Sequence, residues 1–520
     1  MNSLPSTESA PAAFAPSRSW FWLLLAFALY GVARYPFVTH ASGQMDEQWF
    51  AVPGLTMWQE GIPRIPYCPT RRRETYFENA DKCIMALPPG LHYVQAPFFA
   101  VLPAGYPTAR MPLFLGGFAV IALVWYFSGM VCSSAAIGGI ATCMVAVSRP
   151  LLFTAVTARP DLLCALCGIG AMLVLWRWDT EPKWRTLIAA GFLCGLGALF
   201  HPFAIVFCFQ AGLWSLWRQG SLKERFLRGS VLTTAALVGI SLWLPLIIMF
   251  PFEFNSQFTS NVLERSGPGI ASRMLWPWVS LKQHWNQQWD FNEPTQFLFL
   301  VGGTLLGSTM WLIHKRTSAN MRYLVMTISS IYFTATMAGV HPTKGYWLYP
   351  IALMYPLAVD GIGIAIKSLF GSRTADSWIT KSVLALALAI VMIPGSGIRT
   401  TLTYLRHWGD DRYHAEHFIA KVLKDMPKEG LYMSDVSFVF DIYLSGRETI
   451  LAQPRKRFWG DSELGIDYLF VGQEGIDYLW PDQYETKLLR REGGMETPQD
   501  CFVDIYVPTG TPPLNTTAEK

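Results

Sequence analysis

The chain has 520 residues, of which 52% are hydrophobic and 15% are charged. An ordinary soluble domain carries about 25% charged residues, so this composition indicates a multi-pass membrane protein. The formal net charge of +4 is small for this length and no basic tract is present, which argues against a nucleic-acid partner. In a membrane chain the informative property is where the lysines and arginines lie.

Apolar runs of membrane-spanning length follow one another along most of the chain. Residues 1–19 are rich in Ser, Pro and Ala, and we expect them to form a disordered cytoplasmic tail. Residues 20–38 supply close to the roughly 20 apolar residues that cross a bilayer as one helix. No small-residue cleavage pattern follows, so we predict an uncleaved first helix rather than a signal peptide. Further spans, for about eleven in all, are predicted at 111–131, 133–149, 161–177, 186–200, 203–217, 229–251, 296–313, 323–340, 346–366 and 382–397.

The positions of the basic residues predict the orientation of these helices. Lys and Arg gather in every second short loop, and by the positive-inside rule these loops face the cytoplasm. The other side then receives two long loops, 41–110 and 252–295, and everything after residue 398. The polar residues that suggest chemistry fall on this side, whereas an ion path needs ionisable groups through the depth of the membrane. Asp360 is the main exception, and we interpret it as a carboxylate paired within the bundle. The basic residues of the cytoplasmic loops are Arg177, Lys183, Arg185, Arg218, Lys223, Arg225, Arg228, Lys315, Arg316, Arg322, Lys367, Arg373 and Lys381.

The last part of the chain, residues 398–520, has mixed charge, shorter apolar runs and no spanning segment. Helical periodicity over 411–426 and several short apolar runs predict a small α/β domain on the non-cytoplasmic side, after a transmembrane domain over 20–397. Two of the nine cysteines, Cys68 and Cys83, lie in the first outer loop, where an oxidising compartment permits either a disulfide or free thiols. The predicted strands are 430–436, 449–452, 468–471 and 502–507.

Short polar motifs interrupt the apolar sequence, all on the predicted outer side. Two adjacent carboxylates come directly after the first span. A proline pair, an Arg-Pro-Asp turn and a Lys-Gly-Tyr turn follow later in the chain. Adjacent carboxylates at a membrane boundary suggest chemistry performed at the lipid surface. The motifs are Asp46-Glu47, Gly61-Ile62-Pro63, Pro88-Pro89 with Tyr93, Ala158-Arg159-Pro160-Asp161, Lys344-Gly345-Tyr346 and Tyr349-Pro350.

In this order, the motifs resemble those of the GT-C superfamily of membrane glycosyltransferases. Within it the chain is most similar to the relatives of protein mannosyltransferases and of the aminoarabinose transferase that modifies lipid A. The resemblance is strongest over residues 30–165 and weak in the C-terminal domain. It implies a polytopic α-helical membrane protein that transfers a sugar from a polyprenyl-phosphate donor to a lipid, glycan or protein acceptor, with inversion at the anomeric carbon. We expect a multi-pass protein of the bacterial inner membrane with its active site on the periplasmic side.

The predicted catalytic residues are the adjacent acids Asp46 and Glu47. An acceptor hydroxyl is a poor nucleophile until a carboxylate takes its proton, and Asp46 is placed for that role. Partial desolvation at the rim of the bundle would disfavour its charged form and make it a stronger base. Glu47 points in a different direction on either a helix or a strand, so we expect it to orient the acceptor or bind a cation. The alternative is that the pair only caps and solvates a helix end.

Positive charge is needed where the lipid phosphate leaves, because the phosphate oxygens gain charge during the reaction. Arg159 is the first candidate for binding the donor phosphate, since its guanidinium presents a fork of donors that matches phosphate. Lys344 is the second candidate. Asp161 is a candidate for substrate binding. The alternatives are that Asp161 only pairs with Arg159, and that Arg159 only extends to the membrane interface.

Further candidates for substrate contacts lie on the same outer side. The spacing of the histidines forms no recognisable set of metal ligands. The aminoarabinose transferase has acidic and lysine residues where this chain has Ala86 and Leu87, which puts a metal site further in doubt. We therefore expect no cofactor, with a divalent cation as an alternative that the sequence leaves open but does not support. The predicted contacts are His92, Tyr93, His201 and Tyr346.

Two other classes of protein share some of these features. A secondary transporter has paired repeats and interrupted helices around a site at the membrane midplane, and the sequence has no duplicated halves. A flippase or a non-catalytic binder of lipid-linked saccharides needs the same basic and aromatic surface as an enzyme, so it remains the alternative function. Membrane lipids are the other predicted partners.

Overall fold

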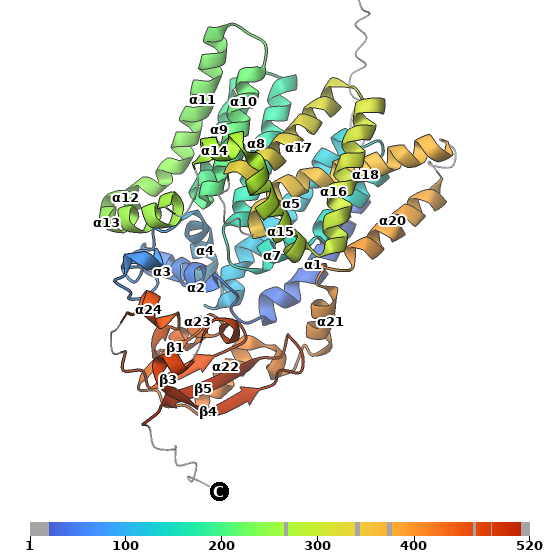
Figure 1. The fold of residues 1–520 in the computed structure, drawn as a ribbon. Coiled ribbons are helices and arrows are strands. Elements are labelled where there is room, and N and C mark those ends of the chain that lie inside the picture. The colour runs from blue at the N-terminus through green and yellow to red at the C-terminus, as the bar shows by residue number, and fades with distance from the viewer. Residues whose placement is uncertain are drawn as a thin grey trace, which may run out of the picture.

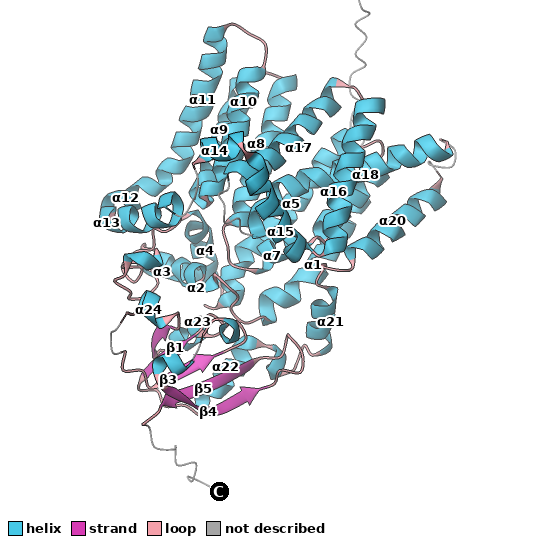
Figure 2. Cartoon of the chain, in the orientation of Figure 1, coloured by secondary structure: helices cyan, strands magenta, loops and turns pink. Residues whose placement is uncertain are grey.

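The structure is a computed structural model that describes residues 20–264, 269–337, 344–371, 377–460, 464–479 and 481–510. The predicted tail, 1–19, lies outside the described residues. Helices build the larger part of the molecule, and a sheet with its own short helices builds the smaller part (Figure 2). The sheet lies at one end of the helical part, beside α2 (Glu47–Phe50), α3 (Val52–Glu60) and α21 (Ile398–Arg406) (Figure 1).

Every predicted span coincides with a helix or a pair of helices in the described part of the chain. Six of these helices are long and apolar enough to cross a membrane, and a seventh span results if the bent pair α6 (Ala135–Ala146) and α7 (Arg149–Val156) is one span. Three more are apolar but shorter, and α17 (Ser318–Met337) coincides with the span predicted at 323–340. The predicted count of about eleven crossings therefore stays a prediction. Four of the six long spans are single helices, namely α1 (Trp20–His40), α5 (Tyr106–Val131), α8 (Asp161–Thr180) and α16 (Pro294–His314). The other two are Leu222–Met249, which contains α11 (Leu222–Ile240) and α12 (Leu244–Met249), and Gly345–Phe370, which contains α18 (Leu348–Phe370). The three shorter ones are α9 (Trp184–Phe200), Pro202–Trp217 with α10 (Ile205–Trp217), and α20 (Trp378–Met392).

Glycines allow the closest helix pairs to pack backbone against backbone. A Cβ atom on Gly195 of α9 would lie 2.0 Å from the carbonyl oxygen of Ala236 on α11. A Cβ atom on Gly361 of α18 would lie 2.2 Å from the Cα atom of Gly307 on α16. Small residues at such crossings are typical of helices that associate inside a membrane, where burial of apolar surface gives little driving force.

The basic loops meet at a common end of the bundle. Asp179, at the end of α8, forms ion pairs with Arg218 at 3.8 Å and Arg322 at 2.5 Å. Asp360 is fully buried and accepts from Lys315 Nζ at 3.0 Å and from Trp311 Nε1 at 2.8 Å, which confirms its interpretation as a paired carboxylate. The loops around these residues thus share one end, while the side of the membrane they face stays a prediction.

The C-terminal domain contains a mixed five-stranded sheet with the strand order β2-β1-β3-β5-β4. Strand β1 pairs in parallel with β2 and β3, whereas β5 pairs antiparallel with β3 and β4. Four strands coincide with the predicted ones, and the predicted helix 411–426 contains α22 (Ala415–Lys424). Strand β4 was not predicted, because its charged residues gave no apolar run. The strands are β1 (Leu431–Ser434), β2 (Glu448–Leu451), β3 (Tyr468–Val471), β4 (Thr486–Gly493) and β5 (Phe502–Pro508).

The two edges of the sheet are protected in different ways. The amide of Leu451, at the free edge of β2, donates to the carbonyl oxygen of Tyr67 at 2.8 Å, so the loop that follows α3 covers this edge. Strand β4 forms the other edge and carries Lys487, Arg490 and Arg491. Charged side chains on an edge strand oppose pairing with other chains.

The carboxylate of Asp435, at the carboxyl end of β1, should make the stability of the folded protein depend on pH. It is fully buried, Ser437 Oγ donates to its Oδ2 at 2.9 Å, and Oδ1 has no hydrogen-bond partner among the described residues. Burial raises the pKa of Asp435 from its usual 3.8 to about 7. The folded protein therefore binds this proton more tightly than the unfolded chain. The free energy that this proton contributes to folding is fully present below about pH 4, and it is lost as the pH rises through about 7.

We expect Asp435→Asn to remove this loss, which amounts to roughly 4 kcal/mol because one pKa unit corresponds to about 1.4 kcal/mol. The advantage of the variant over the parent in thermal unfolding should grow as the pH rises from about 4 to about 8. The exposed Glu448→Gln on the same sheet is the matched control. A pH-independent difference between Asp435→Asn and the parent would contradict the assignment.

Candidate active site

The Asp46 segment, which we define as residues 41–48, connects α1 to α2 and α3. Asp46 directly precedes α2 and has a φ of 75°, in the left-handed region that residues other than glycine rarely adopt. Its side chain is 34% exposed. The structure thus places this carboxylate at a partly exposed position, in agreement with the expected partial desolvation.

Arg159 joins Asp46 to Asp161. The guanidinium of Arg159 forms an ion pair with Asp46 through Nη1 and donates through Nε to Asp161 Oδ2 at 2.8 Å. Arg159 is only 6% exposed. Burial opposes the charge on Arg159, but the carboxylates of Asp161 and Asp46 outweigh burial and raise its pKa. Two residues predicted for the site, the acid after α1 and the cation of the Arg-Pro-Asp turn, are therefore in contact.

The turn between α7 and α8 contacts the Asp46 segment at three consecutive residues. Thr157 Oγ1 donates to Gln44 Oε1 at 3.1 Å, and the amide of Ala158 donates to Glu47 Oε1 at 2.6 Å. Arg159 then completes the series with its ion pair to Asp46. These contacts fix the two segments against each other, so the carboxylates and the cation form one site.

Glu47 has surroundings quite different from those of Asp46. It is fully buried, and Arg110 donates through Nε to Oε1 at 2.9 Å and through Nη2 to Oε2 at 2.5 Å. The amide of Gln44 also donates to Oε2 at 2.8 Å. With the Ala158 amide, these donors occupy both oxygens of Glu47. Protein groups thus occupy both oxygens of Glu47, whereas the side chain of Asp46 is partly exposed.

Arg110 is a residue that the sequence analysis missed. It lies in the first turns of α5, is fully buried, and donates to the carbonyl oxygens of Ala41 at 2.7 Å and Ser42 at 2.6 Å. An arginine at the outer end of an apolar helix is commonly interpreted as one that extends to the membrane surface. Its position on the side predicted to be non-cytoplasmic, which basic residues usually avoid, was the one available signal.

Asp161, His201 and Tyr346 lie together on the other side of Arg159. Asp161 begins α8, and its buried Oδ1 has no hydrogen-bond partner in the described part of the chain. The short helix η6 (Lys344–Trp347) lies against it, because a Cβ atom on Gly345 would be 2.7 Å from Asp161 Cγ. The structure describes the backbone of Lys344, which is the first residue of η6. The predicted Lys-Gly-Tyr motif is therefore adjacent to the Arg-Pro-Asp motif.

His201 is a neutral hydrogen-bonding group in this arrangement. Burial lowers the pKa of His201 to about 4. The amide of Phe203 donates to His201 Nδ1 at 3.0 Å, so the ring proton is assigned to Nε2, which lies 3.4 Å from Tyr346 Oη. His201 and Tyr346 thus present a hydrogen-bonding pair next to Asp161.

His92 and Tyr93 point in different directions from α4 (Gly90–Val101). The buried ring of His92 lies 6.5 Å from the ring of Phe50 on α2, and burial lowers its pKa to about 4. Tyr93 Oη instead donates to the carbonyl oxygen of Leu242 at 3.1 Å, just before α12. His92 is therefore near the Asp46 segment, whereas the contact of Tyr93 is with a different part of the bundle.

The structure describes neither a disulfide nor a cluster of metal ligands in the described part of the chain. Cys68 and Cys83 are both free thiols, buried in two different hydrophobic clusters. Within the described ranges, no group of three or more His, Cys, Asp or Glu residues is arranged to hold a metal ion. The absence of a cofactor stays a prediction.

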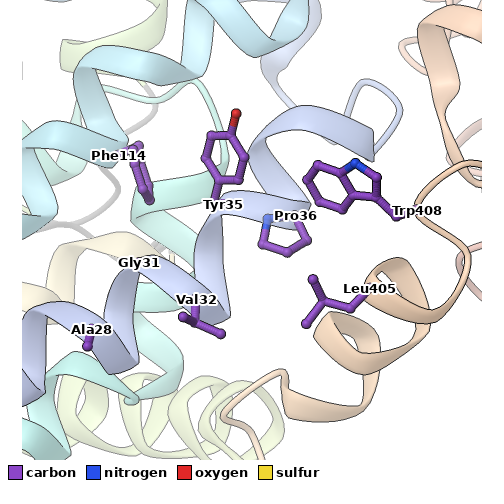
Figure 3. A pocket seen from close by; sticks show the side chains of 8 residues that line it. All are labelled: Ala28, Gly31, Val32, Tyr35, Pro36, Phe114, Leu405 and Trp408. Carbon is purple, nitrogen blue, oxygen red and sulfur yellow. The ribbon is translucent and has the colours of Figure 1, made fainter.

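An apolar groove of about 490 Å³ lies apart from these residues, between α1, α5 and α21 (Figure 3). Tyr35 and Trp408 flank Pro36 at one end of it. None of the predicted site residues lines this groove. The residues that line it are Ala28, Gly31, Val32, Tyr35, Pro36, Phe114, Leu405 and Trp408.

Comparisons with known proteins agree with the motifs. Residues 86–248 match the model of a family described as dolichyl-phosphate-mannose-protein mannosyltransferase. This matched range contains Arg159, Asp161 and His201. Among curated proteins, none matches this sequence.

Two crystal structures of ArnT from Cupriavidus metallidurans have a similar fold. The structure bound to undecaprenyl phosphate has a TM-score of 0.58 and 13% sequence identity, and the match covers 94% of this chain and 98% of that chain. The apo structure has a TM-score of 0.57 and 14% identity, with the same coverage of both chains. Together with the family model, these matches confirm the resemblance to the GT-C superfamily of membrane glycosyltransferases.

Proposed function

We propose that the protein is a membrane glycosyltransferase that moves a sugar from a polyprenyl-phosphate donor to a hydroxyl of a lipid, glycan or protein acceptor. The reaction takes place at the non-cytoplasmic face and inverts the anomeric carbon. The observation that carries this proposal is the array of Asp46, Arg159 and Asp161, in which an accessible carboxylate contacts a buried cation. The names of the matched family and of the ArnT complex support a lipid-phosphate donor.

In this reaction Asp46 is the general base. It takes the proton of the acceptor hydroxyl as the acceptor oxygen bonds to the anomeric carbon. The bond between that carbon and the phosphate oxygen breaks on the opposite face, and its electron pair stays on the phosphate. Arg159 donates to the phosphate oxygens and stabilises the charge that develops there.

Arg159 also links donor binding to the ion pair of Asp46. Without a donor, its guanidinium is paired with Asp46 and Asp161. A phosphate that recruits Arg159 weakens its contact with Asp46 and leaves the Asp46 carboxylate free to accept from the acceptor hydroxyl. Asp161 keeps the second contact with Arg159. Donor binding therefore exchanges one ion-pair partner of Arg159, Asp46, for the donor phosphate.

The remaining predicted residues have supporting roles in this proposal. The free Oδ1 of Asp161 accepts from a sugar hydroxyl, since a buried carboxylate oxygen without a partner is costly until it is paired. His201 and Tyr346 contact the same sugar, and Lys344 is a second cation for the phosphate. Glu47 positions the Asp46 segment, because Arg110 and two backbone amides occupy its oxygens.

The proposal is tested with purified protein in lipid nanodiscs and a panel of labelled undecaprenyl-phosphate sugars. One of these donors should lose its label to an acceptor in a membrane extract and release free undecaprenyl phosphate. The Asp46→Asn protein should leave the same donor intact. Movement of the labelled donor between leaflets with its sugar–phosphate bond preserved would instead support the flippase alternative.

Arg159→Ala should lower kcat/KM for the donor by about 10²- to 10³-fold, the usual effect of losing a donor to a developing oxyanion. Arg159→Lys keeps the charge but loses the fork of donors, so it should recover only part of this activity. Arg71→Ala is the matched control, because Arg71 pairs with Asp81 in the first outer loop, where it is 53% exposed. Equal kinetics for Arg159→Ala and the parent would remove Arg159 from the site.

A further inference from the structure

The C-terminal domain contacts the Asp46 segment directly. The amide of Gly43 donates to the carbonyl oxygen of Ser437 at 3.0 Å. Tyr106 Oη, at the start of α5, donates to the carbonyl oxygen of Val436 at 2.5 Å. These two acceptors are neighbours in the turn 435–438, which follows β1. One turn of the C-terminal domain therefore binds both the Asp46 segment and the helix that carries Arg110.

Gly43 fits a space that admits no side chain. A Cβ atom at this position would lie 2.1 Å from the Val436 carbonyl oxygen and 2.4 Å from Cζ of Tyr106. The backbone of the segment thus lies directly against both the turn 435–438 and the Tyr106 ring. Any shift of that turn would be transmitted to Gly43, which is only three residues before Asp46.

Other contacts hold the segment on both sides of Asp46. Arg110 binds the carbonyl oxygens of Ala41 and Ser42, as described above, and Tyr67 Oη donates to the carbonyl oxygen of Gln48 at 2.9 Å. Asp46, at the centre, keeps its left-handed φ of 75°. A residue persists in such a conformation only when the surrounding structure imposes it.

The two domains also share a hydrophobic core at this interface. Trp49 and Val52, from α2 and α3, belong to the same buried cluster as Met433 and Phe440 of the C-terminal domain. The ring of Phe440 packs edge-on against Tyr106, with 5.4 Å between the ring centroids. The C-terminal domain is therefore packed firmly enough to fix the position of the turn 435–438.

We infer that the C-terminal domain is a positioning element for the reaction. The turn 435–438 holds Gly43 and Tyr106, and these two positioning residues set the backbone geometry that places the carboxylate of Asp46. The inference rests on the proposed role of Asp46 as the base. It gives the C-terminal domain a role in kcat, distinct from binding the acceptor.

Tyr106→Phe tests this inference because it removes the hydroxyl that binds Val436 and keeps the packed ring. Its kcat for sugar transfer should fall roughly 10- to 100-fold with the donor KM within about twofold of the parent, as expected for a small displacement of a reacting group. Gly43→Ala should have the same effect through its added Cβ atom. Tyr468→Phe, on β3, is the matched control and should keep the parent kcat.

The decisive measurement combines these changes with Asp46→Asn. If Tyr106 acts through Asp46, Tyr106→Phe should cause no further loss in the Asp46→Asn background, and its thermal unfolding midpoint should match that of Tyr468→Phe. The inference would be overturned if Tyr106→Phe lowered kcat equally in the parent and in the Asp46→Asn background. It would also be overturned if Tyr106→Phe and Gly43→Ala both kept the parent kcat, or if only the KM for the acceptor changed. A parent-like rate for Asp46→Asn alone would instead overturn the proposed function.

Discussion

Asp46→Asn should reduce sugar transfer by about 10²- to 10⁴-fold, the contribution that a positioned general base usually makes. The amide has nearly the size of the carboxylate and its oxygen can still accept from Arg159, but it cannot take the acceptor proton. Donor binding should therefore survive while kcat is lost. Single-turnover transfer from a labelled donor, together with equilibrium binding of undecaprenyl phosphate, separates these two effects.

The control for this variant is Asp81→Asn, which removes another outer carboxylate paired with an arginine. It should transfer sugar at the rate of the parent protein. An Asp46→Asn protein that transfers sugar at the rate of the parent would contradict the mechanism, whatever its affinity for the donor. A variant that has lost both binding and transfer would indicate that Asp46 organises the phosphate site through Arg159 and is not the base.

Arg110→Met should destabilise the protein by about 3–5 kcal/mol, because breaking a buried ion pair leaves an uncompensated charge in the interior. The side chains of Arg110 and Glu47 are both fully buried. The variant would also leave the carbonyl oxygens of Ala41 and Ser42 without their donor. Thermal or denaturant unfolding of the purified protein measures this loss.

The double variant Glu47→Leu with Arg110→Met should be more stable than Arg110→Met alone, since it removes the stranded charge together with its partner. Arg64→Met provides the comparison on the surface, where the i,i+4 pair of Arg64 with Glu60 is partly exposed and should contribute about 0.3–0.5 kcal/mol. A loss for Arg110→Met no larger than the loss for Arg64→Met would contradict a buried ion pair at this position.

The motifs predicted the meeting of Asp46 and Arg159 because the proposed chemistry requires an acid and a cation on one substrate. The separation of the roles of Asp46 and Glu47 was less predictable. Adjacent residues point in different directions, but the sequence does not tell which direction leads to the interior. That depends on Arg110, which is 63 residues away in the chain and was not among the predicted site residues.

Apolar run length predicted the helices well, since each predicted span coincides with a helix in the described residues. The same criterion could not predict β4, which is an edge strand with charged side chains and depends on its pairing with β5. It also could not predict the contact of Gly43 with Ser437, because neither residue differs locally from an ordinary loop residue. Contacts of this kind are set by how two distant parts of the chain pack.

The hydrogen bond between Tyr67 and the edge strand β2 has a consequence for expressing fragments of the protein. A fragment cut near residue 398 would leave the amide of Leu451 and its neighbours on an open strand, ready to pair with another copy. The C-terminal part expressed alone should therefore aggregate, unless the loop that contains Tyr67 is grafted onto it. In swaps of this part between relatives, the loop and the sheet form a single transferable unit, although nearly 400 residues separate them in the chain.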